Sequence, residues 1–202
     1  MATQNYFAPG WTSQSDTANT EQGSGAAFLG IGQPASQGYL AWSVEPQDAT
    51  TVVANPTSTG NNLIKVYFPV GGFASKVDVN ITTVGTQTHT YFGLYTLAGV
   101  QIAVTADLTA SWTGTGKFTA TFASPALVSP GFYYVLWNQT FSVAPQVTSG
   151  ATCLVQNFNT TAATMFFGLG GGAGANSATP PATITLANNT ASTAGVPWVA
   201  VY

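Results

Sequence analysis

The sequence contains very little charge. Charged residues make up 4% of its 202 positions, against about 25% in an average soluble domain. Arginine is absent, and the three cations are Lys65, Lys76 and Lys117. Binding to nucleic acid relies on clustered Lys and Arg that neutralise phosphates. Three scattered lysines in a chain of net charge −3 therefore exclude nucleic acid as an expected partner.

Cysteine and histidine occur once each. A single cysteine, Cys153, excludes an intrachain disulfide and gives no metal motif, so we expect it to be a small buried apolar residue. His89 has no second histidine and no serine motif to work with, and we interpret it as a strand or turn residue. The glycine-rich stretch 168–174 lacks the Lys-Ser/Thr ending of a phosphate loop. We expect no catalytic residues, no metal and no cofactor.

Long apolar runs are also missing. No stretch supplies the roughly 20 mainly apolar residues that a membrane-spanning helix needs, so we expect no insertion into a membrane. The first residues lack both the basic region and the apolar region of a signal peptide, and we therefore expect a protein that does not enter the secretory route.

Apolar and aromatic residues are abundant. The hydrophobic share is 45%, with 12 Phe, 8 Tyr and 5 Trp, and a disordered chain would be poor in these residues. The sequence therefore predicts a folded protein whose surface is rich in Thr, Ser and Asn in place of Lys and Glu. Such a surface suits a β-rich protein that packs in an assembly, where buried charge is costly.

Residues 91–137 contain the clearest structural pattern. It begins with a predicted hairpin that turns at Ala98-Gly99 and ends with an aromatic strand that is apolar on both faces and therefore central in a sheet. The predicted elements are strands Tyr91–Thr96 and Val100–Thr105, a loop Ala106–Gly116, an alternating strand Lys117–Phe122 and the strand Phe132–Trp137.

Alternation with a period of two recurs outside this unit. In Lys76–Thr82 it predicts that Val77, Val79 and Ile81 are buried, while Lys76, Asp78 and Asn80 face water. Leu63–Phe68 alternates in the same way. Further strands are predicted at Gln37–Glu45, Thr50–Ala54, Ala151–Gln156, Thr164–Phe167, Ala182–Leu186 and Pro197–Tyr202, with turns or loops at 55–62, 84–88 and 169–175.

Many short strands separated by Gly, Pro and Asn turns, with no amphipathic helical stripe, predict an all-β fold. We expect an antiparallel β-sandwich, jelly-roll-like in form, over residues 37–202. Residues 1–36 show no period and carry the aromatics Tyr6, Phe7, Trp11 and Phe28. We interpret them as an extended N-terminal arm that anchors the chain on a neighbouring subunit or another protein; the alternative is that these aromatics join the chain's own core.

The motif order within residues 37–202 resembles a domain found in minor tail and adhesin-type proteins of tailed phages, most familiar from phages of actinobacteria. The resemblance lies in GLYTLAG, in TADLTASW, in the later PGFYYV strand and in the closing PATITLANNTASTAGVPWVAVY. It implies a jelly-roll-like sandwich on a virion, presented as a homo-oligomer such as a trimer. The expected partners are other virion proteins, reached through the N-terminal arm, and a host-surface glycan. A capsid decoration or head fibre protein is the alternative.

Asp107 and Trp112 are the candidate ligand-binding residues. A carboxylate beside an aromatic ring can bind a sugar, whereas the structural alternative is that Asp107 caps its own loop and Trp112 covers a sheet edge. The chain has more Trp and Tyr than one small core needs. Each of the following rings is a candidate for a glycan contact or a subunit contact, with core packing as the alternative: Trp42, Trp112, Trp137, Trp198, Tyr91, Tyr95, Tyr133 and Tyr134. A glycan-degrading enzyme is a third hypothesis, disfavoured because the six carboxylates are isolated in the sequence.

Overall fold

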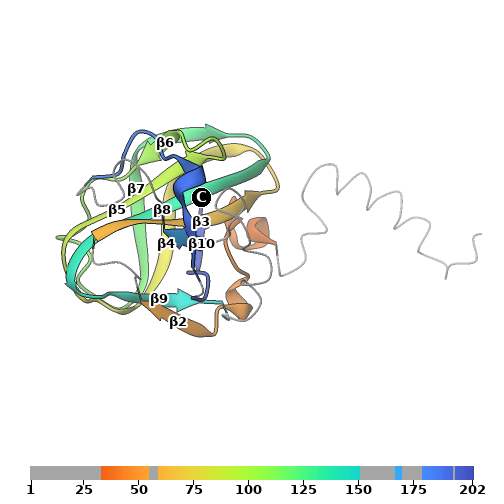
Figure 1. Ribbon diagram of the computed structural model, residues 1–202. Coiled ribbons are helices and arrows are strands. Elements are labelled where there is room, and N and C mark those ends of the chain that lie inside the picture. Colours follow the sequence, from red (N-terminus) through yellow and green to blue (C-terminus); the bar gives the residue numbers. More distant parts are fainter. Residues whose placement is uncertain (1–32, 55–58, 151–166, 170–178, 193) are drawn as a thin grey trace, which may run out of the picture.

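A computed structural model of the chain describes residues 33–54, 59–150, 167–169, 179–192 and 194–202. Its regular elements are strands and short 3-10 turns (Figure 1). The long strands are β3 (Thr59–Phe68), β4 (Gly72–Thr83), β5 (Thr86–Thr96), β7 (Gly116–Val128) and β8 (Gly131–Val143). The short strands are β1 (Ala41–Trp42), β2 (Thr51–Ala54), β6 (Gln101–Val104), β9 (Gln146–Ser149), β10 (Phe167–Leu169), β11 (Thr190–Ala191) and β12 (Val199–Val201). The 3-10 turns are η1 (Pro34–Gln37), η2 (Pro46–Asp48) and η3 (Leu186–Asn188).

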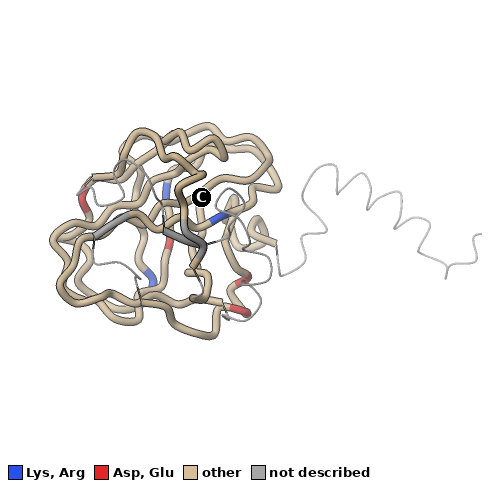
Figure 2. The backbone as a smooth tube through the Cα atoms, viewed as in Figure 1, with Lys and Arg blue, Asp and Glu red and all other residues tan. Residues whose placement is uncertain are grey.

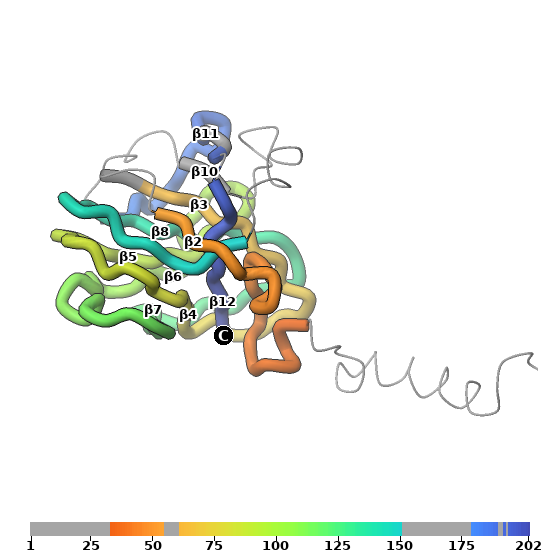
Figure 3. The backbone as a smooth tube through the Cα atoms, turned by 90° about the horizontal axis from the view of Figure 1, so that it is seen from below, coloured from red at the N-terminus to blue at the C-terminus, as the bar shows by residue number. Residues whose placement is uncertain are grey.

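Every strand pairing is antiparallel, and the strands form a sandwich. In one layer β8 lies between β3 and β5, and β6 extends the layer beyond β5. In the other layer β4 pairs with β7 on one side and with β12 and β9 on the other. At one edge, strands β12 and β1 connect β4 of one layer to β3 of the other. At the opposite edge, an isolated bridge between Thr105, directly after β6, and Phe122 of β7 links the two layers. Figure 3 shows the layers from below. The predicted antiparallel all-β sandwich is confirmed.

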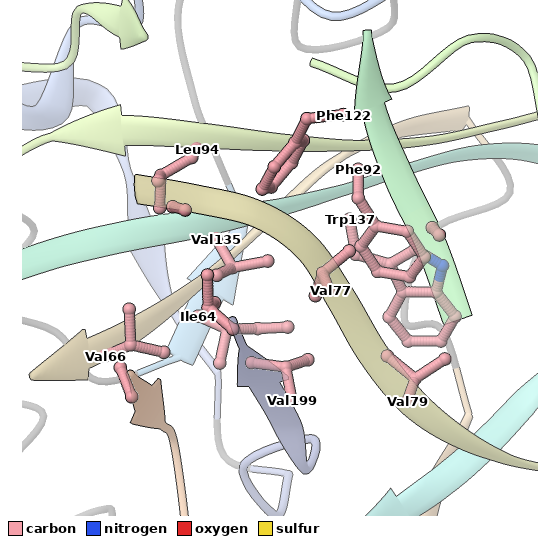
Figure 4. Close-up of a cluster of buried hydrophobic side chains, with 14 of the residues drawn as sticks. Ile64, Val66, Val77, Val79, Phe92, Leu94, Phe122, Val135, Trp137 and Val199 are labelled. Atoms are coloured by element: carbon pink, nitrogen blue, oxygen red, sulfur yellow. The ribbon is translucent and has the colours of Figure 1, made fainter. Parts of the chain in front are cut away.

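Inward-facing apolar side chains from both layers form the main core. Figure 4 shows Ile64, Val135 and Leu94 of one layer meeting Val77 and Phe122 of the other. The predicted inward set on β4 is confirmed, because Val77, Val79 and Ile81 are all buried. The prediction for the opposite face of β4 was wrong at one position, since Asp78 is completely buried. Strand β8 is central, as its apolar pattern predicted.

The outer faces of the sheet carry two further apolar clusters. One joins Leu63, Tyr95, Tyr134 and Leu136 to Ile184, and the other joins Trp42, Trp198 and Ala200. Together with the main core they use six of the eight rings that had seemed surplus: Trp42, Trp112, Trp137, Trp198, Tyr95 and Tyr134 are all buried. Of the three uses left open by the sequence, core packing is therefore the one that the structure shows for these six rings, because apolar residues pack on the outer faces of the sheet as well as between the layers. Tyr91 and Tyr133 remain partly exposed.

The predicted turn at Ala98-Gly99 is confirmed, and the structure explains the glycine. Gly99 has a positive φ of 79°, and its N–H donates to the carbonyl of Thr96 at 2.9 Å. A Cβ at this position would lie 2.0 Å from the carbonyl oxygen of Ile184. Only glycine meets both the left-handed conformation and this close approach.

Several predicted boundaries were wrong. Strand β5 begins at Thr86, inside the predicted 84–88 turn, and β3 begins at Thr59, inside the predicted 55–62 turn. Within Gln37–Glu45 only Ala41–Trp42 is a strand, and Ala182–Leu186 contributes a single bridge, between Thr183 and Val100. These strand boundaries depend on pairing with strands that are distant in the sequence, and the turn-forming residues nearby were too weak a signal to locate them.

Other predictions fall on residues that the structure does not describe. These are the N-terminal arm as far as residue 32, the strand at 151–156, the first three residues of the 164–167 strand, the loop at 170–175 and the burial of Cys153. Within the described part of the chain, no helix is long and apolar enough to cross a membrane.

Candidate functional site

Asp107 lies at the start of the loop between β6 and β7, and its carboxylate organises the loop around it. Oδ1 accepts hydrogen bonds from the Thr109 hydroxyl at 2.6 Å and from the Thr109 backbone N–H at 3.0 Å. The same oxygen accepts a bond from the backbone N–H of Thr90, on β5, at 3.2 Å. These contacts make Asp107 a cap that ties its loop to the neighbouring strand.

His89 and Tyr91 reach the same carboxylate from β5. His89 Nδ1 lies 2.9 Å from Asp107 Oδ2, and because a carboxylate only accepts, the contact places a proton on Nδ1. The His89 and Tyr91 rings stack with their centroids 6.4 Å apart. The side chains of His89 and Asp107 are 40% and 35% exposed. We call His89, Tyr91, Asp107 and Thr109 the loop cluster.

The hydrogen bonds of the loop cluster set its electrostatics. Burial alone would raise the pKa of the Asp107 carboxyl, but the hydrogen bonds from Thr109, His89 and Thr90 outweigh burial and hold that pKa well below its usual range. Burial, and then the neighbouring Asp107 charge, raise the pKa of the Tyr91 hydroxyl. The cluster therefore keeps one fixed negative charge beside the His89 ring.

Trp112 is spatially separate from this chemistry. Its ring is 1% exposed and packs against Phe92, Phe118 and Trp137 in the main core. Its indole N–H donates to the carbonyl of Val84 at 3.1 Å. The sequence placed Asp107 and Trp112 in one loop, and the structure directs them to different sides of it. The indole ring therefore offers no face to a ligand, and Asp107 has His89 and Tyr91 as its aromatic neighbours.

A second polar cluster, which the sequence did not reveal, surrounds Asp78 on β4. Its Oδ2 lies 2.8 Å from Lys117 Nζ of β7 and accepts a hydrogen bond from the Tyr39 hydroxyl at 2.8 Å. Its Oδ1 accepts a bond from the Thr119 hydroxyl at 2.6 Å. We call Tyr39, Asp78, Lys117 and Thr119 the inner cluster. It fastens the segment before β1 to the β4–β7 layer.

A small pocket opens between η2 and the outer surface of β4 and β9. Its volume is about 220 Å³, and its lining is Pro46, Ala49, Asn80, Thr148 and Trp198. The Asn80 amide donates to the Thr148 hydroxyl at 2.5 Å, so that hydroxyl keeps its own hydrogen for another acceptor. The lining is uncharged and combines the Trp198 side chain and two small apolar residues with one amide and one hydroxyl, which is chemically suited to a neutral polar ligand such as a sugar.

Exposed apolar side chains gather where the β3–β4 and β7–β8 turns meet. On the outer face of one layer Tyr67 and Phe132 are paired across β3 and β8, with ring centroids 4.9 Å apart and exposures of 49% and 44%. On the outer face of the other layer Phe73 and Leu127 are paired across β4 and β7, with exposures of 68% and 70%. We call these the aromatic pair and the Phe73–Leu127 pair.

Charged residues are sparse along the described backbone, as Figure 2 shows. Within the described residues no three His, Cys, Asp or Glu side chains gather as a metal site would require. A search of protein-family models gave no match, and a search of curated proteins gave no similar sequence.

Proposed function

We propose that this chain is a structural protein of a phage particle that works by assembly and binding, without catalysis. The observation that carries the proposal is the apolar end of the sandwich. Four large side chains are about half exposed or more there: Tyr67, Phe132, Phe73 and Leu127. Exposed apolar patches of this kind mark contact surfaces, and the low charge of the chain as a whole suits an interface core.

The arrangement of the carboxylates supports a non-catalytic role. Asp78 and Asp107 belong to different clusters, and each has a cationic or ionisable partner together with hydroxyl donors. Glycosidases of the common type need two carboxyl groups facing one another across a substrate. An acid that is already saturated with hydrogen bonds in its own fold is poorly placed for that task.

The assignment to a phage particle rests on the resemblance of the sequence motifs to minor tail and adhesin-type proteins. The GLYTLAG hairpin is β5–β6, and the PGFYYV segment opens β8, so these two motifs belong to the β8–β5–β6 part of one layer. We infer a minor tail or host-attachment role in a homo-oligomer on the virion surface. The pocket at Trp198 supports a neutral glycan of the host surface as the ligand.

Capsid decoration is the second candidate. It is favoured by the 32 residues that precede the described fold, which carry aromatic side chains and are long enough to reach a neighbouring protein. The two roles differ in where the protein sits on the particle and in what the purified protein blocks.

Two measurements separate these roles. Gold-labelled antibody against the purified chain, applied to particles of the phage that encodes it, should mark the tail for attachment and the head for decoration. Purified protein at saturating concentration should block adsorption of those particles to host cells only if it attaches. Particles that carry no label would overturn the virion proposal.

A further inference from the structure

We propose that the aromatic pair, Tyr67 and Phe132, is the docking site for the N-terminal segment, residues 1–32, of the same chain. This deepens the proposed function by naming the surface that holds the arm before assembly. It rests on the proposed function for its biological purpose only, since the contact can be measured on the isolated protein.

The receiving surface joins an apolar floor to a cation. The Tyr67 and Phe132 rings touch across β3 and β8, and Lys65 Nζ lies 5.0 Å from the centroid of the Phe132 ring. Val70, in the following turn, is 43% exposed and extends the apolar surface toward the sandwich end. A patch of two rings, one aliphatic side chain and one ammonium suits a ligand that is apolar and acidic.

The N-terminal segment has this complementary composition. Residues 1–32 contain two acids, Asp16 and Glu21, and no Lys or Arg. The apolar residues of its last five positions, Phe28, Leu29 and Ile31, come directly before the described chain begins at Gln33. The segment can therefore place an apolar group on the ring pair and a carboxylate near Lys65.

The chain also enters the fold next to this surface. Trp42 of β1 is the register partner of Tyr67 itself. Figure 3 shows the red-orange start of the described chain on the side of the fold where the gold β3 ends. The entry point is fixed, because Pro34 of η1 is buried.

Reach and effective concentration favour the same chain over another copy. An unstructured chain of 32 residues spans about 30 Å on average, a reach that covers the surface around the attachment point at Gln33. Tethering of this kind gives an effective concentration on the order of millimolar, above that of any second copy in dilute solution. Docking to the chain's own ring pair is therefore the arrangement expected before the protein meets a partner.

Hydrogen exchange followed by mass spectrometry tests the proposal on the full-length chain. Three proteins are compared: the natural sequence, the double variant Tyr67→Ser/Phe132→Ser, and the matched control Phe73→Ser/Leu127→Ser from the opposite layer. A docked state populated at about 90% slows amide exchange about tenfold. We expect this protection within residues 20–32 of the natural protein and of the control, and its loss in the Tyr67/Phe132 variant.

Every other outcome overturns the proposal. An arm that exchanges at the unprotected rate in the natural protein removes docking altogether. Equal protection in both double variants places the arm on some other surface. Protection that rises with protein concentration, together with a larger mass in light scattering, moves the docking to a second copy. The virion labelling described above can succeed or fail independently of all three results.

Discussion

The inner cluster and the loop cluster are built alike and differ in what surrounds them. Each has one aspartate, one basic partner and one threonine hydroxyl bonded to the carboxylate. Asp78 of the inner cluster has no exposed side-chain surface, whereas 35% of the Asp107 side chain is exposed. The same arrangement of a carboxylate, a basic side chain and a threonine hydroxyl therefore occurs in one buried and one partly exposed environment of the same sandwich.

This difference assigns the clusters different roles. A buried carboxylate that loses a partner keeps its full desolvation penalty, while an exposed one is rehydrated. The inner cluster should therefore decide whether the segment before β1 is held to the β4–β7 layer. The loop cluster should decide only the shape of its own loop, which makes its residues the more available for binding.

The largest expected loss of stability comes from a core substitution, which serves as the reference for the substitutions in both clusters. Phe122 of β7 is 3% exposed and packs in the main core from the same strand that carries Lys117 and Thr119. Phe122→Ala should lower the free energy of unfolding by about 4 kcal/mol, because it removes buried apolar contacts and leaves a cavity. Urea denaturation measures this. Phe73→Ala, on an exposed ring, is the control and should cost less than about 0.5 kcal/mol.

Asp78→Asn should rank next. The substitution keeps the shape but removes a buried charge that accepts bonds from Tyr39, Thr119 and Lys117, and its new N–H₂ group faces donors. Loss of a buried, hydrogen-bonded pair of this type costs about 3 kcal/mol. Urea denaturation checks the value. A cost equal to that of Asp107→Asn would erase the distinction between the two clusters.

Period-two patterns and turn residues predicted the sandwich because both depend only on residues that are neighbours in the sequence. Burial of Val77, Val79 and Ile81 follows from alternation along one strand, and the turn at Gly99 follows from one residue's backbone freedom. Burial of Asp78 does not follow from its neighbours. It depends on Lys117, 39 residues later, and on Tyr39, 39 residues earlier, meeting it across three segments.

The candidate site was partly predictable. Register was the available signal for His89, because Gly93 pairs with Val104, and continuing this pairing brings Thr90 opposite Asp107, one residue from His89. The burial of Trp112 had a weaker signal: Leu108 and Trp112 are spaced by four, and the Trp112 N–H donates to the Leu108 carbonyl in a helical turn. The pocket at Trp198 had none, since its lining comes from four distant segments.

The dependence of the free energy of unfolding on pH above neutrality tests the inner cluster separately from the loop cluster. Hydrogen bonds to Asp78 and Tyr39 raise the pKa of the Lys117 amine above its usual range. A raised pKa gives stability that is complete below the unfolded value, near 10.5, and is lost as pH rises past it. Lys117→Met should cost about 2 kcal/mol at neutral pH, less than a fully buried pair because 59% of the side chain is exposed.

That cost should shrink as the pH rises above about 10. Burial also raises the pKa of the Tyr95 hydroxyl, to about 12, which weakens the fold in the same range. Tyr95 is present in both proteins, so its contribution cancels in the difference between the natural chain and Lys117→Met. Chemical denaturation at a series of pH values gives that difference. If it stays constant, the Lys117 charge contributes nothing through Asp78.

The smallest effect belongs to Asp107→Asn and appears on the acid limb. The pKa of Asp107 is lowered in the folded state, so its contribution is present above the ordinary value near 3.8 and is lost as pH falls. Solvent screening limits this contribution to about 1 kcal/mol or less at neutral pH. The natural protein and the variant should therefore begin to converge in stability as the pH falls below about 4, where the Asp107 carboxyl of the unfolded chain begins to be protonated while that of the folded chain is still ionised. Thr109→Val, which removes one donor and keeps the charge, is the matched control and should keep part of the pH dependence. If Asp107→Asn instead costs as much as Asp78→Asn at neutral pH, the loop cluster holds the fold together as the inner cluster does, and its residues are not available for binding.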